Sequence, residues 1–538
     1  MLQVASVFSN HMVLQRDKMI AIFGKATDHI RVSGAIKGFP KRSTMAANGK
    51  FVLHLPPMKA GGPYELTIES EGQEVTFSDV YIGEVFIAGG QSNMEFELGN
   101  CMEGEEELKQ ESFPLIRFYY TQKKSILDDE FYASERNTSW AVAGDEWMKA
   151  WSAVGYFFAK KLQTTLGVPV GIIGCNWGGT SASAWMDSES LIEDEELRSY
   201  VDEYEKAIEG KSIAEQIKEY DDYVIYHAKW EAEVAKLYEK DPAMSWNKAQ
   251  EILGPCQWPG PMNCKNPYRP SGLYECMLQR IMPYTVNGVI WYQGESDDHK
   301  PRMYEKLFMK MIQRWRVYFD NPELYFLVVQ LPMNRYETDP DYKHWPYIRE
   351  AQERVCGNAA NAFMTVISDY SQLNDIHPKY KKPVGDRLAD LATRHIYHIN
   401  SEICVDPPKV EFVDFHDGVA DIYFVNAEDG FEVREPFCAS LRTVQYDPDV
   451  VRGFELASYD RVYYEAVVDE MANNRIRIHS DPVLEPVYVR FAWTNYMDVN
   501  LFARNSGLPV PTFRSSMRDE RKEDEELGKA QIQQIMEV

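Results

Sequence analysis

The pattern of apolar and polar positions changes along the chain and divides it into regions. Residues 1–82 contain short apolar or alternating runs between glycine-containing turns, which predicts an N-terminal β-sandwich. In residues 83–402 apolar strands alternate with helical patterns, which predicts an α/β domain with a parallel sheet covered on both faces. Strand patterning returns in residues 403–515 and predicts a C-terminal β domain. Residues 516–538 are a highly charged tail, for which we expect a frayed helix or disorder.

Mostly apolar runs in the middle region are predicted to be parallel strands at 85–88, 170–174, 288–292, 324–331 and 363–368. Apolar residues at helical spacing predict helices at 156–166, 304–318 and 382–398. The charged stretch at about 189–253 is also helical in pattern, and we interpret it as an insertion into the α/β domain.

Composition narrows the class of protein. The 538 residues are too many for one hydrophobic core, and 44% apolar residues suffice for several. The formal net charge of -26 argues against a nucleic-acid partner. No apolar run is long enough to span a bilayer. The residues after Met1 lack the pattern of a signal peptide, so we expect a cytoplasmic protein, or a periplasmic or secreted one if a signal was removed before Met1.

The cysteines do not indicate a metal site. The eight of them form no CxxC pair and no Cys/His cluster, so we expect no zinc. Cys256 and Cys264 are close enough in sequence to bridge a loop in an oxidising compartment, and two free thiols are equally expected.

A candidate nucleophile follows the first predicted strand of the α/β domain. The apolar run 85–88 is followed by Gly89 and Gly90, which allow a tight turn, and then by Ser92 at a helix start. A serine on a sharp strand-to-helix turn presents its hydroxyl at the carboxyl edge of the sheet, where open α/β folds bind ligands. An ordinary capped turn would have the same local sequence. We favour a nucleophilic serine over a capped turn because of His377, which lies far downstream.

Other segments could complete a site for ester hydrolysis. A serine hydroxyl needs an imidazole to take its proton, which His377 would supply. The tetrahedral intermediate carries an oxyanion that fixed donors must meet. The amide of Ser92, an amide of Gly178 or Gly179, and the side-chain amide of Gln293 would provide three donors at the ends of predicted strands.

These segments also resemble a known family. Gly90-Gln-Ser-Asn-Met94, Trp177-Gly-Gly-Thr180, Trp291-Tyr-Gln-Gly-Glu-Ser296 and Asp375-Ile-His-Pro378 are similar, in this order, to the motifs of sialate O-acetylesterases in the SGNH hydrolase superfamily. Flanking segments such as His11-Met-Val-Leu-Gln15 and Gly507-Leu-Pro509 extend the resemblance over nearly the whole chain. The resemblance implies an SGNH-type three-layer fold, Ser92 as nucleophile and His377 as base. It also implies that neither a metal nor an organic cofactor takes part.

The chain departs from the superfamily pattern at the acid. The superfamily commonly places a carboxylate three residues before the histidine, where this chain has Asn374, and Asp375 lies only two residues before His377. Asp375, Glu295 or a backbone carbonyl could hold the imidazole. We put Asp375 first, because alternate side chains of an extended segment share a face. Gln91, Asn93 and Glu295, which lie in the segments 90–94 and 291–296, are further candidates for supporting roles.

The function expected from the resemblance is removal of O-acetyl groups from carbohydrate, first of all from O-acetylated sialic acid. One alternative keeps the mechanism but takes acetylated xylan or another plant polysaccharide. A second is a carbohydrate-binding protein with an inactive esterase core, against which the intact Ser92, Gln293 and His377 argue. Among the tryptophans, candidates for stacking on sugar rings are Trp177, Trp185, Trp258 and Trp291, of which Trp291 in its apolar strand is expected to be core.

Overall fold

A computed structural model describes most of the chain. The described residues are 1–109, 113–241, 244, 246–336, 340–400, 402–437, 447 and 449–516. The charged tail expected from residue 516 onwards lies outside them except for its first residue.

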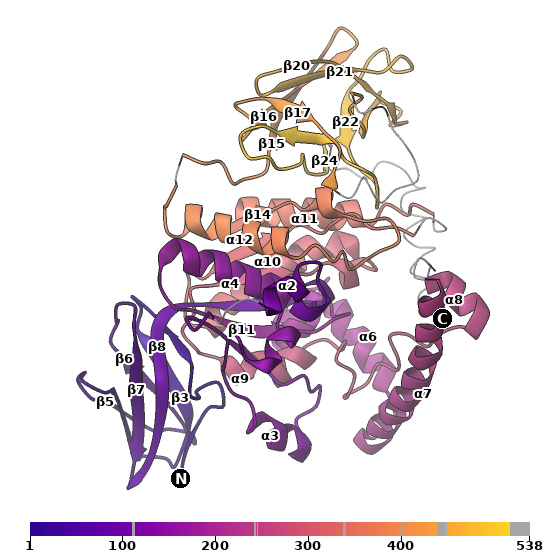
Figure 1. The fold of residues 1–538 in the computed structure, drawn as a ribbon. Coiled ribbons are helices and arrows are strands. Elements are labelled where there is room, and N and C mark those ends of the chain that lie inside the picture. The colour runs from indigo at the N-terminus through magenta and orange to yellow at the C-terminus, as the bar shows by residue number, and fades with distance from the viewer. Residues whose placement is uncertain are drawn as a thin grey trace.

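A largely parallel sheet forms the centre of the molecule, with the strand order β10-β9-β11-β8-β12-β13-β14 (Figure 1). The strands are β8 (Gln73–Gly90), β9 (Ile116–Tyr120), β10 (Ala141–Val142), β11 (Val170–Asn176), β12 (Gly288–Tyr292), β13 (Tyr325–Val329) and β14 (Ala362–Thr365). Every neighbouring pair is parallel except β10 with β9. The parallel arrangement predicted for five apolar runs is therefore confirmed, although the sequence analysis missed β9 and β10.

Helices cover both faces of this sheet. Side chains alternate along β8, so that Val85 and Ile87 enter one core while Phe86 and Ala88 enter another. The first core includes buried residues of α10 (Tyr304–Tyr318) and α11 (Trp345–Asn358). The second includes buried residues of α4 (Ala153–Leu166) and α12 (Lys382–His395), which pack against each other. Strand β8 is buried continuously from Ile82 to Gly90, because helices cover both faces of the sheet and β8 has a neighbouring strand on each side.

Strand β8 also joins the N-terminal region to the α/β region. Its first half pairs with β7 in antiparallel fashion, and its second half lies between β11 and β12. The position between residues 82 and 83, where the sequence pattern changes, therefore lies inside one continuous strand. The other N-terminal strands are β1 (Leu2–Val4), β2 (Val13–Gln15), β3 (Ile20–Ala26), β4 (Arg31–Ile36), β5 (Arg42–Met45), β6 (Lys50–Leu55) and β7 (Gly61–Ser70).

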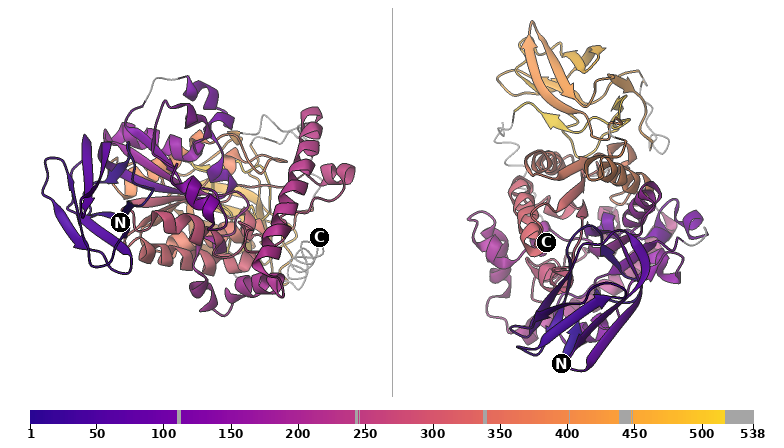
Figure 2. Two further views of the ribbon diagram at one scale, coloured as in Figure 1. Left: turned by 90° about the horizontal axis from the view of Figure 1, so that it is seen from below. Right: turned by 90° about the vertical axis from the view of Figure 1, so that its left-hand side faces the viewer.

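The C-terminal region consists of antiparallel sheets with a core of their own. Its strands are β15 (Lys409–His416), β16 (Val419–Val425), β17 (Phe431–Val433), β18 (Phe454–Ala457), β19 (Tyr464–Glu465), β20 (Val467–Ala472), β21 (Arg475–His479), β22 (Tyr488–Phe491), β23 (Leu501–Ala503) and β24 (Phe513–Arg514). The C-terminal sheets and the N-terminal strands lie on opposite sides of the α/β region (Figures 1 and 2). Arg514 joins β24 to α11 through an ion pair with Glu350 at 2.8 Å.

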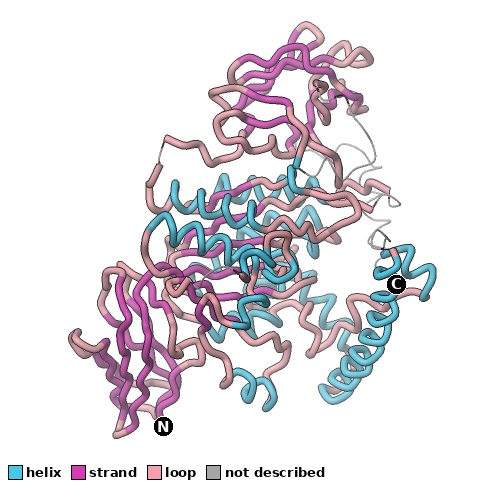
Figure 3. The backbone as a smooth tube through the Cα atoms, viewed as in Figure 1, coloured by secondary structure: helices cyan, strands magenta, loops and turns pink. Residues whose placement is uncertain are grey.

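The charged stretch at about 189–253 is helical, as predicted. It contains α5 (Ser188–Ile192), α6 (Arg198–Ile208), α7 (Ile213–Lys240) and α8 (Trp246–Leu253). The long helix α7 runs along the outside of the molecule (Figure 3). Its start is fixed by a capping box, in which the side chains of Ser212 and Glu215 bond each other's backbone N–H.

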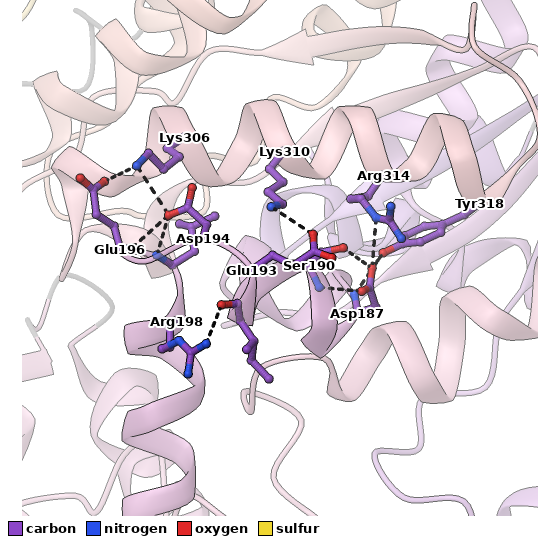
Figure 4. A network of polar contacts seen from close by, with 12 residues as sticks. Asp187, Ser190, Glu193, Asp194, Glu196, Arg198, Lys306, Lys310, Arg314 and Tyr318 are labelled. Carbon is purple, nitrogen blue, oxygen red and sulfur yellow. Dashed lines mark hydrogen bonds and ion pairs between the residues drawn. The ribbon is translucent and has the colours of Figure 1, made fainter.

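A row of polar side chains on α10 holds the beginning of this helical stretch (Figure 4). Lys306, Lys310, Arg314 and Tyr318 are spaced four residues apart, so they share one face of the helix. They face acidic groups between residues 187 and 196: Lys306 contacts Glu196 at 2.7 Å, and Arg314 contacts Asp187 at 3.3 Å. The Asp187 carboxylate also accepts the Ser190 N–H and thereby caps α5.

Short elements complete the described chain. The α-helices among them are α1 (Ser92–Glu95), α2 (Gly104–Leu108), α3 (Asp129–Glu135) and α9 (Gln279–Ile281). The 3-10 helices are η1 (Leu98–Asn100), η2 (Glu146–Ala150), η3 (Ala182–Trp185), η5 (Glu295–Asp297), η6 (Pro301–Met303) and η7 (Ser368–Tyr370), and η4 (Tyr274–Leu278) is a π-helix. Within the described residues, no helix has the length and apolarity to cross a membrane.

We predict that Gly90→Ala disrupts the turn between β8 and α1. Gly90 has φ of 134°, and a Cβ there would lie 2.1 Å from the carbonyl oxygen of Tyr292. The substitution should lower the urea midpoint of unfolding, with a loss of unfolding free energy above about 2 kcal/mol, and should displace Ser92 at the start of α1. Gly49→Ala is the control, because Gly49 also has positive φ (72°) but has no atom within 4 Å of the added Cβ. Equal effects of the two substitutions would contradict the prediction.

Candidate active site

Loops that follow the central strands of the sheet meet around Ser92. Ser92 is the first residue of α1, directly after β8. Gly178 follows β11 and Gln293 follows β12, and these two strands are the neighbours of β8. A Cβ built on Gly178 would lie 3.1 Å from Cβ of Ser92, so the Gly178 loop lies against the serine. The sequence thus placed these segments correctly at one edge of the sheet.

Ser92 and His377 form a hydrogen-bonded pair. The Nε2 atom of His377 lies 2.8 Å from Oγ of Ser92, although the residues are 285 positions apart. Burial and the neighbouring Lys381 lower the pKa of His377 to about 4. The imidazole is therefore neutral at pH 7 and can accept a proton from the hydroxyl. This is the geometry that a serine nucleophile and its general base require.

Asp375 lies in this loop but does not contact the ring of His377. Its Oδ1 atom accepts the backbone N–H of His377 at 2.8 Å. Among the described residues, no hydrogen bond or ion pair joins the Asp375 carboxylate to the imidazole. The expected contact is therefore not present. The expectation assumed an extended segment, whereas the chain bends at residues 376 and 377 and the Asp375 carboxylate turns back onto the His377 N–H.

Asn93 joins the loops on either side of Ser92. Its Nδ2 atom donates to Oε1 of Glu295 at 2.6 Å and to the carbonyl oxygen of Ile376 at 3.0 Å. Its Oδ1 atom accepts from Nζ of Lys381 at 2.5 Å. The side chain following the candidate nucleophile thus holds the residue preceding His377 in place. These hydrogen bonds support the predicted supporting roles of Asn93 and Glu295, which consist in positioning the loop of His377.

The ionisable groups around Asn93 are buried and perturbed. Burial lowers the pKa of Lys381 to about 7, against the opposing charges of Glu295 and Asp375. Burial also raises the pKa of Glu295. The Lys381 ammonium lies 4.8 Å from the centre of the Phe96 ring, which adds a cation–π contact. Sequence analysis missed Lys381, because only the fold brings it against Asn93.

Gln91 fixes the loop that follows β12. Its Oε1 atom accepts the backbone N–H of Ser296 at 3.2 Å and that of Gly294 at 3.4 Å. Its side chain is buried and therefore points away from solvent. The predicted supporting role of Gln91 is thus to hold the loop carrying Gln293 and Glu295.

The side-chain amide of Gln293 does not point its N–H groups at Ser92. Nε2 donates to the carbonyl oxygen of Thr180 at 3.2 Å and to Oδ2 of Asp297 at 2.5 Å. Both hydrogens of the amide are therefore used, and Oε1 accepts the hydroxyl of Tyr304 at 2.9 Å. This arrangement differs from the expected oxyanion donor and makes Gln293 a link between the loops after β11 and β12. The buried Asp297, whose pKa burial raises, was missed by the sequence analysis.

The backbone N–H of Gly178 has an unexpected partner. It donates to Oε2 of Glu95 at 2.5 Å, and Oε1 of Glu95 forms an ion pair with Lys123. Gly178 can therefore serve an oxyanion only after the Glu95 carboxylate moves away. The N–H of Ser92, as the first residue of α1, has no acceptor within the helix and is the other backbone donor at this position. Gly179, the alternative donor, has φ of 74° and lies against the ring of Tyr268.

Other chemistry expected from the sequence can be compared with the structure. The described cysteines, Cys256 and Cys264 among them, are free thiols, and Cys438 lies outside the described residues. Within the described part, no group of three or more His, Cys, Asp or Glu side chains could hold a metal ion. Trp185 and Trp291 are fully buried and cannot stack on a sugar, whereas Trp258 is 46% exposed.

We predict that Asp375→Asn retains most esterase activity on an aryl acetate. The amide oxygen of asparagine can still accept the N–H of His377, and the present contact needs no charge at the ring. Asp375→Ala removes the acceptor and should lower kcat/KM by about tenfold. Ser92→Ala and His377→Ala serve as inactive references. If Asp375→Asn were as inactive as His377→Ala, the carboxylate would be the group that orients the imidazole after all.

We also predict an unusually acidic pH profile. Because His377 acts as a base only when neutral, kcat/KM should fall only as the pH approaches about 4, the value to which burial and Lys381 lower its pKa. The measurement is kcat/KM for an aryl acetate between pH 3.5 and 8, with tryptophan fluorescence recorded at each pH to separate unfolding from titration. If kcat/KM fell with an apparent pKa near 6.5, the ordinary histidine value, burial and Lys381 would not lower the pKa of His377 in the free enzyme.

Comparisons with known proteins point to carbohydrate esterases. A family model described as carbohydrate esterase, sialic acid-specific acetylesterase, matches residues 257–393. The sialate O-acetylesterase of Pongo abelii is 25% identical over 96% of this chain and 93% of that protein, and the one of Mus musculus is 25% identical over 95% and 93%. The crystal structure of a carbohydrate acetylesterase from Xanthomonas citri has a TM-score of 0.73 and 27% identity, covering 96% of this chain and all of that one. The chain is thus a sialate O-acetylesterase-like carbohydrate esterase.

Proposed function

We propose that this esterase removes O-acetyl groups from sialic acid residues through an acetyl-serine intermediate, in an SGNH-type three-layer domain. The observation that carries the mechanism is the 2.8 Å contact between Oγ of Ser92 and Nε2 of His377 at the carboxyl ends of parallel strands. The proposed sugar rests on the relatives, which are sialate O-acetylesterases, and on the matching family model.

In the first half of the reaction, Nε2 of His377 takes the proton of the Ser92 hydroxyl as Oγ attacks the acetyl carbonyl carbon. The negative charge that develops on the carbonyl oxygen is met by the N–H groups of Ser92 and Gly178. When the C–O bond to the sugar breaks, the imidazolium returns the proton to the sugar oxygen. The sugar leaves with a free hydroxyl, and the acetyl group stays on Ser92.

In the second half, His377 takes a proton from a water molecule that attacks the acetyl-serine. The tetrahedral intermediate collapses, Oγ of Ser92 regains its proton from the imidazolium, and acetate is released. The oxyanion position serves both halves, so the Glu95 carboxylate must leave the Gly178 N–H in each. The displaced carboxylate could stay paired with Lys123, because Lys123 already forms an ion pair with Oε1 of Glu95, whereas Gly178 binds Oε2.

We predict that the wild-type protein releases acetate from O-acetylated sialic acid and that Ser92→Ala abolishes this release. Losing the nucleophile should lower kcat by at least about 10³-fold, because the acetyl-serine can no longer form. Acetate is quantified after incubation with O-acetylated sialic acids and with acetylated xylo-oligosaccharides. Equal urea midpoints of wild type and Ser92→Ala would exclude misfolding as the cause.

The outcomes of this panel separate the alternatives. Release from xylo-oligosaccharides alone would keep the Ser92–His377 mechanism and replace the sugar. Binding of sugars without acetate release, and without hydrolysis of an aryl acetate, would identify an inactive esterase core that binds carbohydrate. Activity that survives Ser92→Ala would overturn the proposed mechanism.

A further inference from the structure

A row of aromatic side chains leads from the Gly178–Gly179 loop to the long helix α7. We call it the aromatic row, and its members are Tyr268, Trp258, His227 and Tyr223. The ring centres are 5.1 Å apart between Tyr268 and Trp258, 5.5 Å between Trp258 and His227, and 5.4 Å between His227 and Tyr223. The row thus connects the loop 254–275 to the helical stretch 189–253, neither of which contributes to the Ser92–His377 pair.

One end of the aromatic row lies beside the candidate nucleophile. A Cβ on Gly179 would lie 2.7 Å from the ring of Tyr268, and one on Gly178 would lie 3.1 Å from Cβ of Ser92. Only the thickness of this glycine turn therefore separates Tyr268 from Ser92. A side chain on Gly179 would collide with the tyrosine, so the glycine permits the close approach of loop and ring.

The structure holds the aromatic row in a fixed position. The loop that carries Trp258 and Tyr268 is bound to α7 by the ion pair of Lys265 with Asp221 at 2.5 Å and by the bond from the Cys264 N–H to Gln216 at 3.1 Å. Gly260 passes directly over Tyr223, since a Cβ there would lie 2.5 Å from its ring. These contacts come from different parts of the loop, so Trp258 cannot move far relative to α7.

Trp258 is nevertheless exposed. The exposed fraction is 46%, whereas Tyr223 at the other end of the row is buried. Packing alone does not require an exposed indole at this place, because Tyr223 and the loop contacts already join the loop to the helix. Fixed, partly exposed aromatic rings present an apolar face, and the C–H face of a pyranose ring is the apolar surface that carbohydrates offer in return.

We propose that Trp258 and Tyr268 form a subsite for a sugar ring of the substrate beyond the acetylated residue, so that the enzyme prefers glycan chains to monosaccharides. This proposal rests on the proposed function and specifies its substrate class. The shared chemistry is the apolar face of a pyranose, which either a sialylated glycan or a xylan chain could supply. The Tyr268 ring lies against Gly179, so in this proposal the glycan chain leaves Ser92 on the side of Gly179.

The test compares Trp258→Ala and Trp258→Phe with the wild type. The substrates are an O-acetylated sialic acid as the free sugar and at the end of sialyllactose, together with acetylated xylose and acetylated xylotetraose. The wild type is expected to hydrolyse either the sialic acid pair or the xylose pair. For the longer substrate of that pair, Trp258→Ala should raise KM by about tenfold with little change in kcat, and Trp258→Phe should restore most of the affinity. Hydrolysis of an aryl acetate should not change, because that ester reaches only Ser92.

Tyr459→Ala is the control, since Tyr459 is a 76% exposed aromatic side chain in the C-terminal β region. It should leave every KM unchanged. An unchanged KM in Trp258→Ala for both chain substrates, or an equal rise for the free sugars, would overturn the subsite. A rise in KM for the sialyllactose substrate would identify a sialylated glycan as the source of the ring. A rise for the xylotetraose substrate would identify a xylan chain.

A binding measurement keeps the subsite separate from the proposed reaction. Calorimetric titration of Ser92→Ala with unacetylated sialyllactose and xylotetraose should show binding that the double substitution Ser92→Ala, Trp258→Ala weakens by about tenfold. If the wild type released no acetate from any sugar but this difference held, the proposed function would fail and the subsite would stand. Equal affinities in the two variants would refute the subsite.

Discussion

The candidate active site depends on the three hydrogen bonds of the Asn93 side chain. Ser92 follows β8 and His377 follows η7, so no single element sets the distance between them. The Asn93 amide joins the two by binding the Ile376 carbonyl, while Glu295 and Lys381 fix the amide itself. The amide is planar and fully buried, and in this one orientation its N–H groups and its oxygen all have partners. Losing one partner would leave a buried polar group unsatisfied, which costs about 1–3 kcal/mol.

The same contacts determine the charge state of the base. A buried ammonium is unfavourable, and Lys381 is tolerated because Asn93 accepts its hydrogen bond, Glu295 opposes its charge and two aromatic rings face it. Its positive charge in turn disfavours a second positive charge on His377, which adds to the effect of burial. The position of the imidazole and part of the lowering of its pKa thus depend on the same contacts. The nearby carboxylates of Asp375 and Glu95 act in the opposite direction, but burial and Lys381 outweigh them, so the pKa of His377 stays low.

Local patterns predicted most of the fold and the central pair of the site. Apolar runs report burial on both faces, so five parallel strands were found from sequence, and the turn after β8 placed Ser92. Strand β9 was missed because Arg117 interrupts its pattern, and that arginine is buried with an ion pair to the distant Asp79 and hydrogen bonds to the carbonyl oxygens of Pro114 and His11. The contacts of Asp375 and Gln293 were also missed. They depend on the bend at residues 376 and 377 and on Asp297 bonding both Gln293 and the Ala182 N–H, which no spacing in the sequence reveals.

The Glu95 carboxylate shows how such a site can be stable before substrate arrives. An oxyanion position requires N–H groups that point into a small space, and a buried N–H without an acceptor is unfavourable. In this structure Glu95 supplies the acceptor for Gly178, and Lys123 balances its charge. In the proposed mechanism, an oxyanion that forms during the reaction competes with Glu95 for the same N–H, whereas the uncharged carbonyl of the bound ester competes only weakly. The exchange therefore favours the transition state over the ground state, which is the condition for an interaction to accelerate the reaction.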